Sequence, residues 1–262
     1  MRLTPALPET DINHSADSFP EHGYVVLREL LDRGRADELY RVFDELPLGG
    51  SPSSVPGAAP GRLQANERAL VRDSRFLDVL REPALLETVE AALGKDIHLL
   101  AYEAIEIPAG GGKVRDWHCD FHFASDAPLV VNVGIYLQDM EDEHGPLHVV
   151  PGSHRWNREP DPGEVEAALP GEVKLSVPRG SAVVFHGRLW HTGSQNRSSS
   201  PRRAIFPYFG QGWIRRMDDF YRNPLPESVL TSSDPVLKQL FGRNPETAVH
   251  GATYTSDNRD WH

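Results

Sequence analysis

The sequence predicts a mainly β protein, a cupin-like jelly roll of two sheets with helices packed on one outer face. Two observations support this fold class. The first third of the chain has the pattern of helices and loops with one short strand, and from residue 97 short β runs alternate with turn residues. We expect the 262 residues to form a single domain, with a helical part over about 1–96, a jelly-roll core over about 97–210 and a C-terminal extension over about 211–262.

The N-terminal elements follow from local patterns. Residues 19–28 predict a short strand after a turn, and apolar residues at helical spacing predict a helix over 32–46. Residues 47–62 are rich in Pro, Gly and Ser and predict a long loop of the kind that often forms a lid. A second helix is expected over 75–93, with a kink or a new start at Pro83.

The remaining elements are short. Seven segments have the composition of strands and are separated by turns that contain Gly or Pro. They are 97–107, 114–123, 129–137, 147–150, 172–177, 181–186 and 203–209. Two short helices are expected in the C-terminal extension, over 213–220 and 234–241.

Composition excludes several classes of protein. Hydrophobic residues make up 39% of the chain and charged residues 25%, which is typical of a globular protein. The formal net charge of -11 argues against nucleic acid as a partner, because phosphate binding needs clustered Lys and Arg. No apolar run is long enough for a signal peptide or a membrane span, so we expect a cytoplasmic protein with no membrane partner.

The segment RDWHCDFHF, residues 115–123, holds two histidines and two acids around the one cysteine of the chain. If it is a strand, His118, Asp120 and His122 share one face and Cys119 lies on the other. We therefore interpret Cys119 as a small buried hydrophobe rather than a reactive thiol or a ligand. The face that carries His118, Asp120 and His122 is then a candidate metal site.

A His-x-Asp pair is weak evidence for a metal site unless a third ligand joins it. His118 and Asp120 with one distant histidine would form the 2-His-1-carboxylate triad of non-haem Fe(II) oxygenases. The later segment VVFHGRLWHTG offers two candidates, His186 and His191. Arg202 follows His191 by eleven residues and favours it, because a cosubstrate with a remote carboxylate needs a planar fork of donors. We expect His186 to support the site or to pack.

Three motifs in order carry a family resemblance. WHCD at 117–120, HGPLHVVPGSHR at 144–155 and GSAVVFHGRLWHTGSQNRSSSPRRAI at 180–205 resemble the phytanoyl-CoA dioxygenase family of Fe(II)/2-oxoglutarate-dependent oxygenases. The opening segment FPEHGYVVLRELLD, residues 19–32, is similar to the start of that family. The resemblance therefore spans most of the chain, and only the C-terminal ~50 residues are unmatched.

The resemblance implies an enzyme with a double-stranded β-helix, in which His118, Asp120 and His191 hold Fe(II) and Arg202 binds the remote carboxylate of 2-oxoglutarate. Three ligands would leave two positions for the 2-oxo acid and one for O2. Such dioxygenases oxidise a substrate and release succinate and CO2. Halide-installing relatives lack the carboxylate ligand, so Asp120 favours hydroxylation or another oxidation without halogenation.

Two further cosubstrate contacts are expected. Asn132 is a candidate for a second contact to the 2-oxo acid, and its alternative interpretation is a buried amide satisfied by the backbone. The family commonly has a hydroxyl residue two positions after the distal histidine. This chain has Gly193 there and Ser194 next, so Ser194 is the candidate for that contact.

The substrate is expected to be a small organic molecule, derived from a natural product or an amino acid, that is hydroxylated at an unactivated carbon. No basic cluster is present for the phosphates of an acyl-CoA. Candidate substrate residues are His122, Phe206, Tyr208 and Trp213. The alternative is a metal-binding jelly-roll isomerase or binding protein that does not use O2, and Arg202 argues against it because only a 2-oxoglutarate enzyme needs that side chain.

Overall fold

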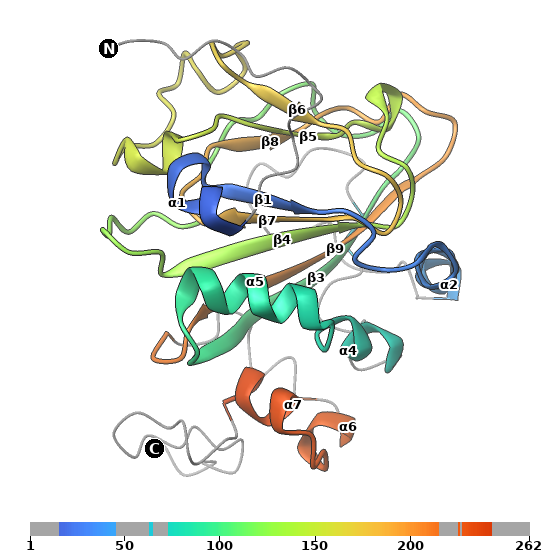
Figure 1. Cartoon of the computed structure of the whole chain (residues 1–262). Coiled ribbons are helices and arrows are strands. Elements are labelled where there is room, and N and C mark those ends of the chain that lie inside the picture. The colour runs from blue at the N-terminus through green and yellow to red at the C-terminus, as the bar shows by residue number, and fades with distance from the viewer. Residues whose placement is uncertain (1–15, 46–62, 65–72, 215–224, 226, 243–262) are drawn as a thin grey trace, which may run out of the picture.

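The computed structural model describes residues 16–45, 63–64, 73–214, 225 and 227–242. Within these residues the strands form two antiparallel sheets, as predicted for a jelly roll (Figure 1). The larger sheet has the order β1-β7-β4-β9-β3-β2, and the smaller has the order β6-β5-β8. The strands of the larger sheet are β1 (Tyr24–Leu27), β7 (Ala182–His186), β4 (Val130–Tyr136), β9 (Arg202–Gln211), β3 (Ile97–Ile107) and β2 (Leu63–Gln64). Those of the smaller are β6 (Val173–Leu175), β5 (Leu147–Val149) and β8 (His191–Gly193).

Alternation along the strands divides the apolar residues into two cores. On β4, Val131, Val133 and Ile135 join a core with residues of the helices, whereas Tyr136 faces the other way. That second core includes Leu147 and other residues of the small sheet, so it lies between the sheets. The inner face of β4 therefore carries Asn132, Gly134 and Tyr136.

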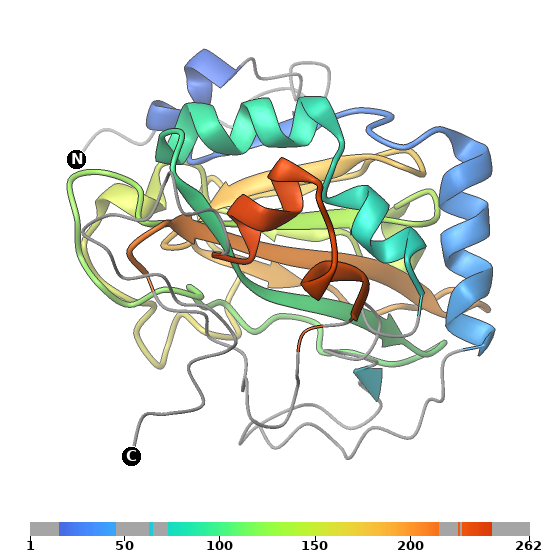
Figure 2. The same ribbon diagram turned by 90° about the horizontal axis from the view of Figure 1, so that it is seen from below.

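The helices cover the outer face of the large sheet. Figure 2 shows α5 (Pro83–Leu93), α4 (Arg75–Val79), α6 (Glu227–Leu230) and α7 (Pro235–Leu240) lying across it. The predicted helix over 75–93 is two helices, because Pro83 lacks an N–H and starts α5 at its first turn. The described part of the chain begins with a 3-10 turn (Ala16–Ser18) and the short helix α1 (Phe19–His22), which Gly23 ends with a φ of 81°.

Helix α2 (Arg33–Glu45) is fastened to the large sheet by a buried arginine. Arg203, on the outer face of β9, donates to Glu106 at 2.7 Å and to Asp44 at 2.6 Å. It also donates to the carbonyl of Tyr40 at 2.6 Å. Glu106 belongs to β3, so the guanidinium ties the helix to two neighbouring strands.

One predicted strand is absent. Residues 114–123 are irregular, apart from an isolated bridge between His118 and His191. The N–H groups of Asp120 and Phe121 both donate to the carbonyl of Gly187, at 3.0 and 2.9 Å. Two successive N–H groups that point to one acceptor break the alternation of a strand, so the strand-parity argument for this segment was wrong.

The other predicted elements can be compared where the structure describes them. The structure confirms eight predicted elements to within two residues at either end. They are the strands over 97–107, 129–137, 147–150, 172–177, 181–186 and 203–209 and the helices over 32–46 and 234–241. The predicted loop over 47–62 and nearly all of the predicted helix over 213–220 lie outside the described residues. Two short 3-10 turns, η3 (Asp142–His144) and η4 (Ser153–Arg155), follow β4 and β5. No helix among the described residues has the length and apolar character needed to span a bilayer.

Candidate metal centre

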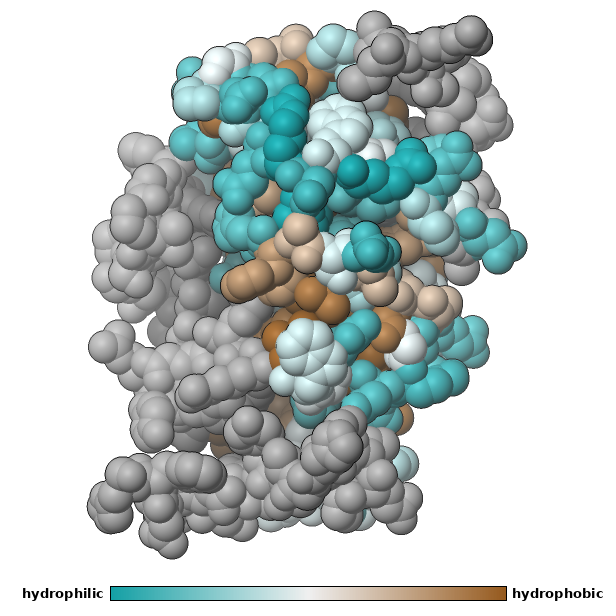
Figure 3. Space-filling model, turned by 90° about the vertical axis from the view of Figure 1, so that its left-hand side faces the viewer, coloured by the Kyte–Doolittle hydropathy of each residue, from teal (hydrophilic) through white to brown (hydrophobic). Residues whose placement is uncertain are grey.

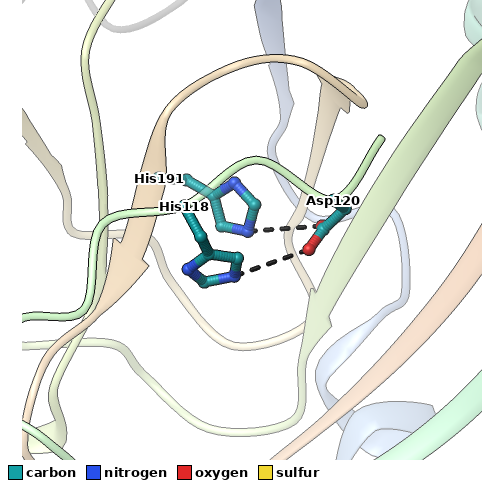
Figure 4. Close-up of side chains that lie close together, drawn as sticks. All are labelled: His118, Asp120 and His191. Atoms are coloured by element: carbon teal, nitrogen blue, oxygen red, sulfur yellow. Dashed lines mark ion pairs between the residues drawn. The ribbon is translucent and has the colours of Figure 1, made fainter. Parts of the chain in front are cut away.

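His118, Asp120 and His191 converge at one point (Figure 4), and their candidate ligand atoms all lie within 4.8 Å of one another. The Nε2 atom of His118 lies 3.4 Å from Oδ1 of Asp120. The Nε2 atom of His191 lies 3.3 Å from Oδ2 of the same carboxylate. The two imidazole rings are 4.3 Å apart between centroids. The predicted grouping of these three side chains is therefore present.

Backbone hydrogen bonds hold the three residues together although the segment is no strand. His118 and His191 exchange both of their N–H···O bonds, at 3.1 and 3.0 Å. Asp120 is fixed by its N–H bond to Gly187. A Cβ on Gly187 would lie 2.9 Å from Cβ of Phe121, so only glycine allows this close approach.

The histidine tautomers are set by carbonyl oxygens. Nδ1 of His118 lies 2.6 Å from the carbonyl of Asp116, and Nδ1 of His191 lies 3.0 Å from that of Leu189. A carbonyl only accepts, so each Nδ1 carries a proton, and in the neutral form of each ring Nε2 presents a lone pair. Both lone pairs then face the oxygens of Asp120. With both rings neutral these lone pairs repel the carboxylate, and a metal cation between them or a proton on one Nε2 removes the repulsion.

The pKa shifts of Asp120 and His191 favour the protonation states that bind a metal, a carboxylate and a neutral imidazole. Burial on its own would raise the pKa of Asp120, but the neighbouring His191 and His118 lower it to about 2. Burial lowers the pKa of His191 to about 4, against a smaller opposing effect of Asp120. For His118 burial opposes protonation, yet the hydrogen bond and charge of Asp120 raise its pKa. At neutral pH the site thus offers a carboxylate and a neutral buried imidazole, beside a second imidazole that the carboxylate polarises.

Asn132 supports the carboxylate. Its side chain is fully buried on the inner face of β4, and its Nδ2 donates to Oδ2 of Asp120. Its Oδ1 is buried without a hydrogen-bond partner among the described residues. The alternative interpretation of a backbone-satisfied amide is therefore wrong, because the partner of the amide is the Asp120 side chain. The contact to a 2-oxo acid stays a prediction.

Arg202 lies at the start of β9 on the inner face and reaches the small sheet. Its Nη1 donates to the carbonyl of Gly145 and, at 3.2 Å, to that of Ser194. A Cβ on Gly193 would lie 3.3 Å from Nη2, so this glycine makes room for the guanidinium. The hydroxyl of Ser194 donates to the carbonyl of Pro146 at 3.2 Å. The roles of Arg202 and Ser194 toward the cosubstrate stay predictions.

Two candidate substrate residues are not brought to the triad. His122 is exposed, and its Nδ1 lies 2.7 Å from Oε1 of Glu159. Its predicted inward orientation is wrong, because it depended on the strand that 114–123 does not form. Trp213 is 64% exposed, and its ring N–H donates to the side chain of Gln211. Substrate roles for both stay predictions.

The other two, Phe206 and Tyr208, do lie on the inner face of β9. Tyr208 pairs in register with Asn132, and Phe206 packs edge-on against Tyr136 with ring centroids 6.5 Å apart. Sequence reasoning missed Tyr136, although parity along β4 from Asn132 would have found it. Burial raises the pKa of Tyr136 to about 12, against a smaller effect of the nearby Arg202.

Three other residues complete the surroundings. Phe185, on the inner face of β7, packs its ring 4.8 Å from that of His191, and sequence reasoning missed it. His186 is the next residue along β7, so it faces the opposite side of the sheet, away from the triad, and packs against His154. Cys119 is free and buried as predicted, and burial raises the pKa of its thiol.

Comparison with known proteins agrees with this geometry. The profile of the phytanoyl-CoA dioxygenase (PhyH) family matches residues 19–204. The chain belongs to the PhyH family. It is thus an enzyme of the Fe/2-oxoglutarate-dependent dioxygenase class, and the matched segment includes the whole triad and Arg202. The remaining C-terminal residues lie outside the match.

Curated relatives of this PhyH chain include a hydroxylase and a dioxygenase. The L-proline trans-4-hydroxylase of Streptomyces griseoviridis is 31% identical over 48% of this chain and 59% of its own length. The dioxygenase af480 of Aspergillus fumigatus is 28% identical over 84% of this chain and 74% of its own length. Part of each relative thus extends beyond the match.

Solved structures share the fold of this PhyH chain. HygX from Streptomyces hygroscopicus, with nickel and 2-oxoglutarate bound, superposes with a TM-score of 0.64 at 16% identity, over 81% of this chain and 91% of HygX. The α-ketoglutarate-dependent epimerase SnoN from nogalamycin biosynthesis gives 0.63 at 20% identity, over 87% of this chain and 91% of SnoN. A second SnoN structure holds Fe3+, α-ketoglutarate and nogalamycin RO.

Proposed function

We propose that this protein is a non-haem Fe(II)/2-oxoglutarate-dependent dioxygenase that hydroxylates an unactivated carbon of a small organic molecule. The observation that carries the proposal is the convergence of His118, Asp120 and His191, with the Nε2 atoms of both imidazoles directed at one carboxylate. Iron with a bound 2-oxo acid would supply the oxidising chemistry: 2-oxoglutarate, O2 and a C–H bond give succinate, CO2 and an alcohol.

The donor set fits a six-coordinate metal such as iron. Metal–ligand bonds of ~2.1 Å at right angles place neighbouring ligand atoms ~3 Å apart. The two Nε2–oxygen distances of 3.4 and 3.3 Å are close to this value without any ion. Two imidazoles and one carboxylate form the triad typical of non-haem Fe(II) oxygenases, and they leave positions open for a 2-oxo acid and O2.

Arg202 is the proposed partner of the remote carboxylate of 2-oxoglutarate. Its guanidinium lies beside Gly193, two residues along β8 from His191. Two residues of a strand span ~7 Å, a distance on the scale of a five-carbon dicarboxylate. Metal and guanidinium could therefore bind opposite ends of one molecule. Tyr136 adds a buried hydroxyl near the same guanidinium.

The substrate class is proposed from the relatives and from the pocket wall. One curated relative is an L-proline hydroxylase, and one solved structure of the same fold holds nogalamycin RO. Both compounds are small molecules. The inner face near the triad presents the aromatic side chains Phe185, Phe206 and Tyr208. These rings would exclude water from the oxidised carbon, and an apolar or cyclic substrate suits them.

The test is turnover of iron-loaded protein with 2-oxoglutarate, O2 and a panel of small molecules that starts with L-proline. We expect succinate formation that depends on one panel member, whose product is 16 mass units heavier and carries 18O from 18O2. His191→Ala should abolish both. A protein that binds iron but neither binds nor consumes 2-oxoglutarate would overturn the proposal.

Product analysis also tests a second outcome, which the epimerase SnoN suggests. Hydroxylation adds one oxygen atom to the substrate, whereas epimerisation leaves its mass unchanged. Turnover of a panel member with consumption of O2 and no change in mass would favour epimerisation. Turnover without consumption of O2 or 2-oxoglutarate would favour the isomerase alternative.

A further inference from the structure

A cavity of about 710 Å³ lies on the outer face of the large sheet, apart from the triad. Its walls come from α1, β1, α5, the segment 124–128, the turn after β5 and the end of β7. His118, Asp120 and His191 do not line it. Its volume is within the range of small-molecule sites. We propose that it binds a small carboxylic acid with an apolar body, through Arg188.

Arg188 is the feature that points to an anion. Arg188 lines the cavity, and the residue is only 5% exposed to solvent. Its Nη1 donates to the carbonyl of His122 at 3.0 Å, and no carboxylate of the described residues forms an ion pair with it. A guanidinium is always charged and has five N–H donors. Burial of such a charge is unfavourable without a partner, so an anionic ligand would complete the site.

The other charges around the cavity are compatible with an acid. Arg155 also lines it, is exposed, and has no ion pair among the described residues. Asp126 is the acidic side chain of the lining, and it is exposed to solvent that screens it. Burial lowers the pKa of His186 to about 3 and also lowers that of His154, so both are neutral at pH 7. The buried charge at the cavity is therefore positive.

The rest of the lining indicates an apolar body for the ligand. Apolar side chains supply much of the wall: Phe19, Val25, Ala91, Ala92, Ala124 and Pro128. Figure 3 views the end of the molecule that carries α1 and shows hydrophobic side chains gathered in its middle, with hydrophilic ones bordering them. One buried guanidinium on such a wall fits a single acid head on an aliphatic or aromatic group, rather than a polyanion.

The cavity and the triad share one loop. Gly187 lies between two lining residues, His186 and Arg188, and its carbonyl accepts the N–H of Asp120. Arg188 also donates to the carbonyl of His122, two residues after Asp120. An acid bound to Arg188 would thus contact the loop 186–188, whose Gly187 carbonyl fixes Asp120. It would lie outside the barrel, at a site separate from the triad.

The experiment is calorimetric titration of the purified protein with 3-phenylpropanoate and with its neutral analogue 3-phenylpropanamide. We expect one saturable site for the acid and binding of the amide that is at least about tenfold weaker, because the amide loses the charge-assisted pair. Arg188→Met should weaken acid binding by a similar factor. Arg202→Met removes the guanidinium inside the barrel and should leave this binding unchanged.

Two further variants decide the outcome if Arg188→Met does not fold. Arg155→Ala changes an exposed side chain and should weaken acid binding severalfold, and Ala92→Trp should fill the cavity and abolish it. The absence of saturable binding to the unmodified protein, binding that survives Ala92→Trp, or binding lost in Arg202→Met would each overturn the proposal. The assay needs neither iron nor turnover, so its result is independent of the proposed function.

Discussion

The side-chain amide of Asn132 donates a hydrogen bond to Oδ2 of Asp120, the oxygen that also lies 3.3 Å from Nε2 of His191. Asn132 is on β4 of the large sheet, whereas Asp120 is on an irregular segment. A rigid strand therefore orients a carboxylate whose own backbone is not part of a sheet. Partners of this kind orient metal ligands and raise affinity for the ion.

Asn132→Ala should weaken metal binding by about 10- to 100-fold, because the carboxylate loses the donor that fixes it. Competition titration with Co(II) measures the change. Asn196→Ala is the matched control: Asn196 is equally buried but donates to the carbonyls of Ile107, Pro108 and Ser200. It should lower stability and leave metal affinity unchanged. Equal metal affinity in Asn132→Ala and the unmodified protein would contradict this role.

Arg202→Met should weaken 2-oxoglutarate binding by at least about 10-fold while metal affinity is retained, because a charge-assisted pair is lost. Arg203→Met is the control on the next residue, which faces outward to Glu106 and Asp44. It should lower the free energy of unfolding by about 3 kcal/mol or more through the unpaired Glu106, without changing 2-oxoglutarate affinity in the folded protein. Loss of 2-oxoglutarate binding only in the Arg203 variant would refute the assignment.

Gly193→Ala tests the space around the guanidinium. The new Cβ would lie 3.3 Å from Nη2 of Arg202, closer than most real contacts, so the guanidinium must move. We expect 2-oxoglutarate affinity to fall severalfold, with metal affinity and thermal stability nearly unchanged. Separate titrations with 2-oxoglutarate and with the metal measure the two affinities, and thermal unfolding measures the stability. An alanine variant with full 2-oxoglutarate affinity would show that Arg202 does not need this position.

His186 should make stability depend on pH. Burial, with smaller effects of His154 and Arg188, lowers its folded-state pKa to about 3 from an ordinary 6.5. Between these values the unfolded chain binds one more proton, so stability falls as pH drops below about 6.5, by up to ~1.4 kcal/mol per pH unit from this group. Urea unfolding at pH 7 and pH 5 should show a smaller loss for His186→Asn, which keeps an acceptor for the Arg188 N–H. Identical losses in both proteins would contradict the lowered pKa.

Much of the fold was predictable because its signals are local. The alternation in 97–107 and 203–209 and the Pro83 helix start depend on near neighbours in sequence, and the structure confirms them. The segment 114–123 was mispredicted because its conformation is decided at a distance. Gly187, more than sixty residues later, accepts two of its N–H groups and bends it. The local sequence pattern of 114–123 does not predict this contact with Gly187.

The three candidate metal ligands of the site were predictable from the sequence, whereas the packing of the residues around them was not. The triad followed from residue types and motif order, but the strand register decides what surrounds it. Phe185, Asn132 and Tyr208 lie side by side only because β7, β4 and β9 pair with that register. His122 illustrates the opposite case, since correct residue chemistry was combined with a strand that does not form.

The most direct test of the central claim is optical. Purified protein is made anaerobic, Fe(II) is added in one equivalent, and 2-oxoglutarate is then titrated while the visible spectrum is recorded. We predict a saturable metal-to-ligand charge-transfer band that is absent in His118→Ala and His191→Ala. If the unmodified protein binds Fe(II) but develops no such band, the assignment of His118, Asp120 and His191 as the iron site of a 2-oxoglutarate enzyme is contradicted.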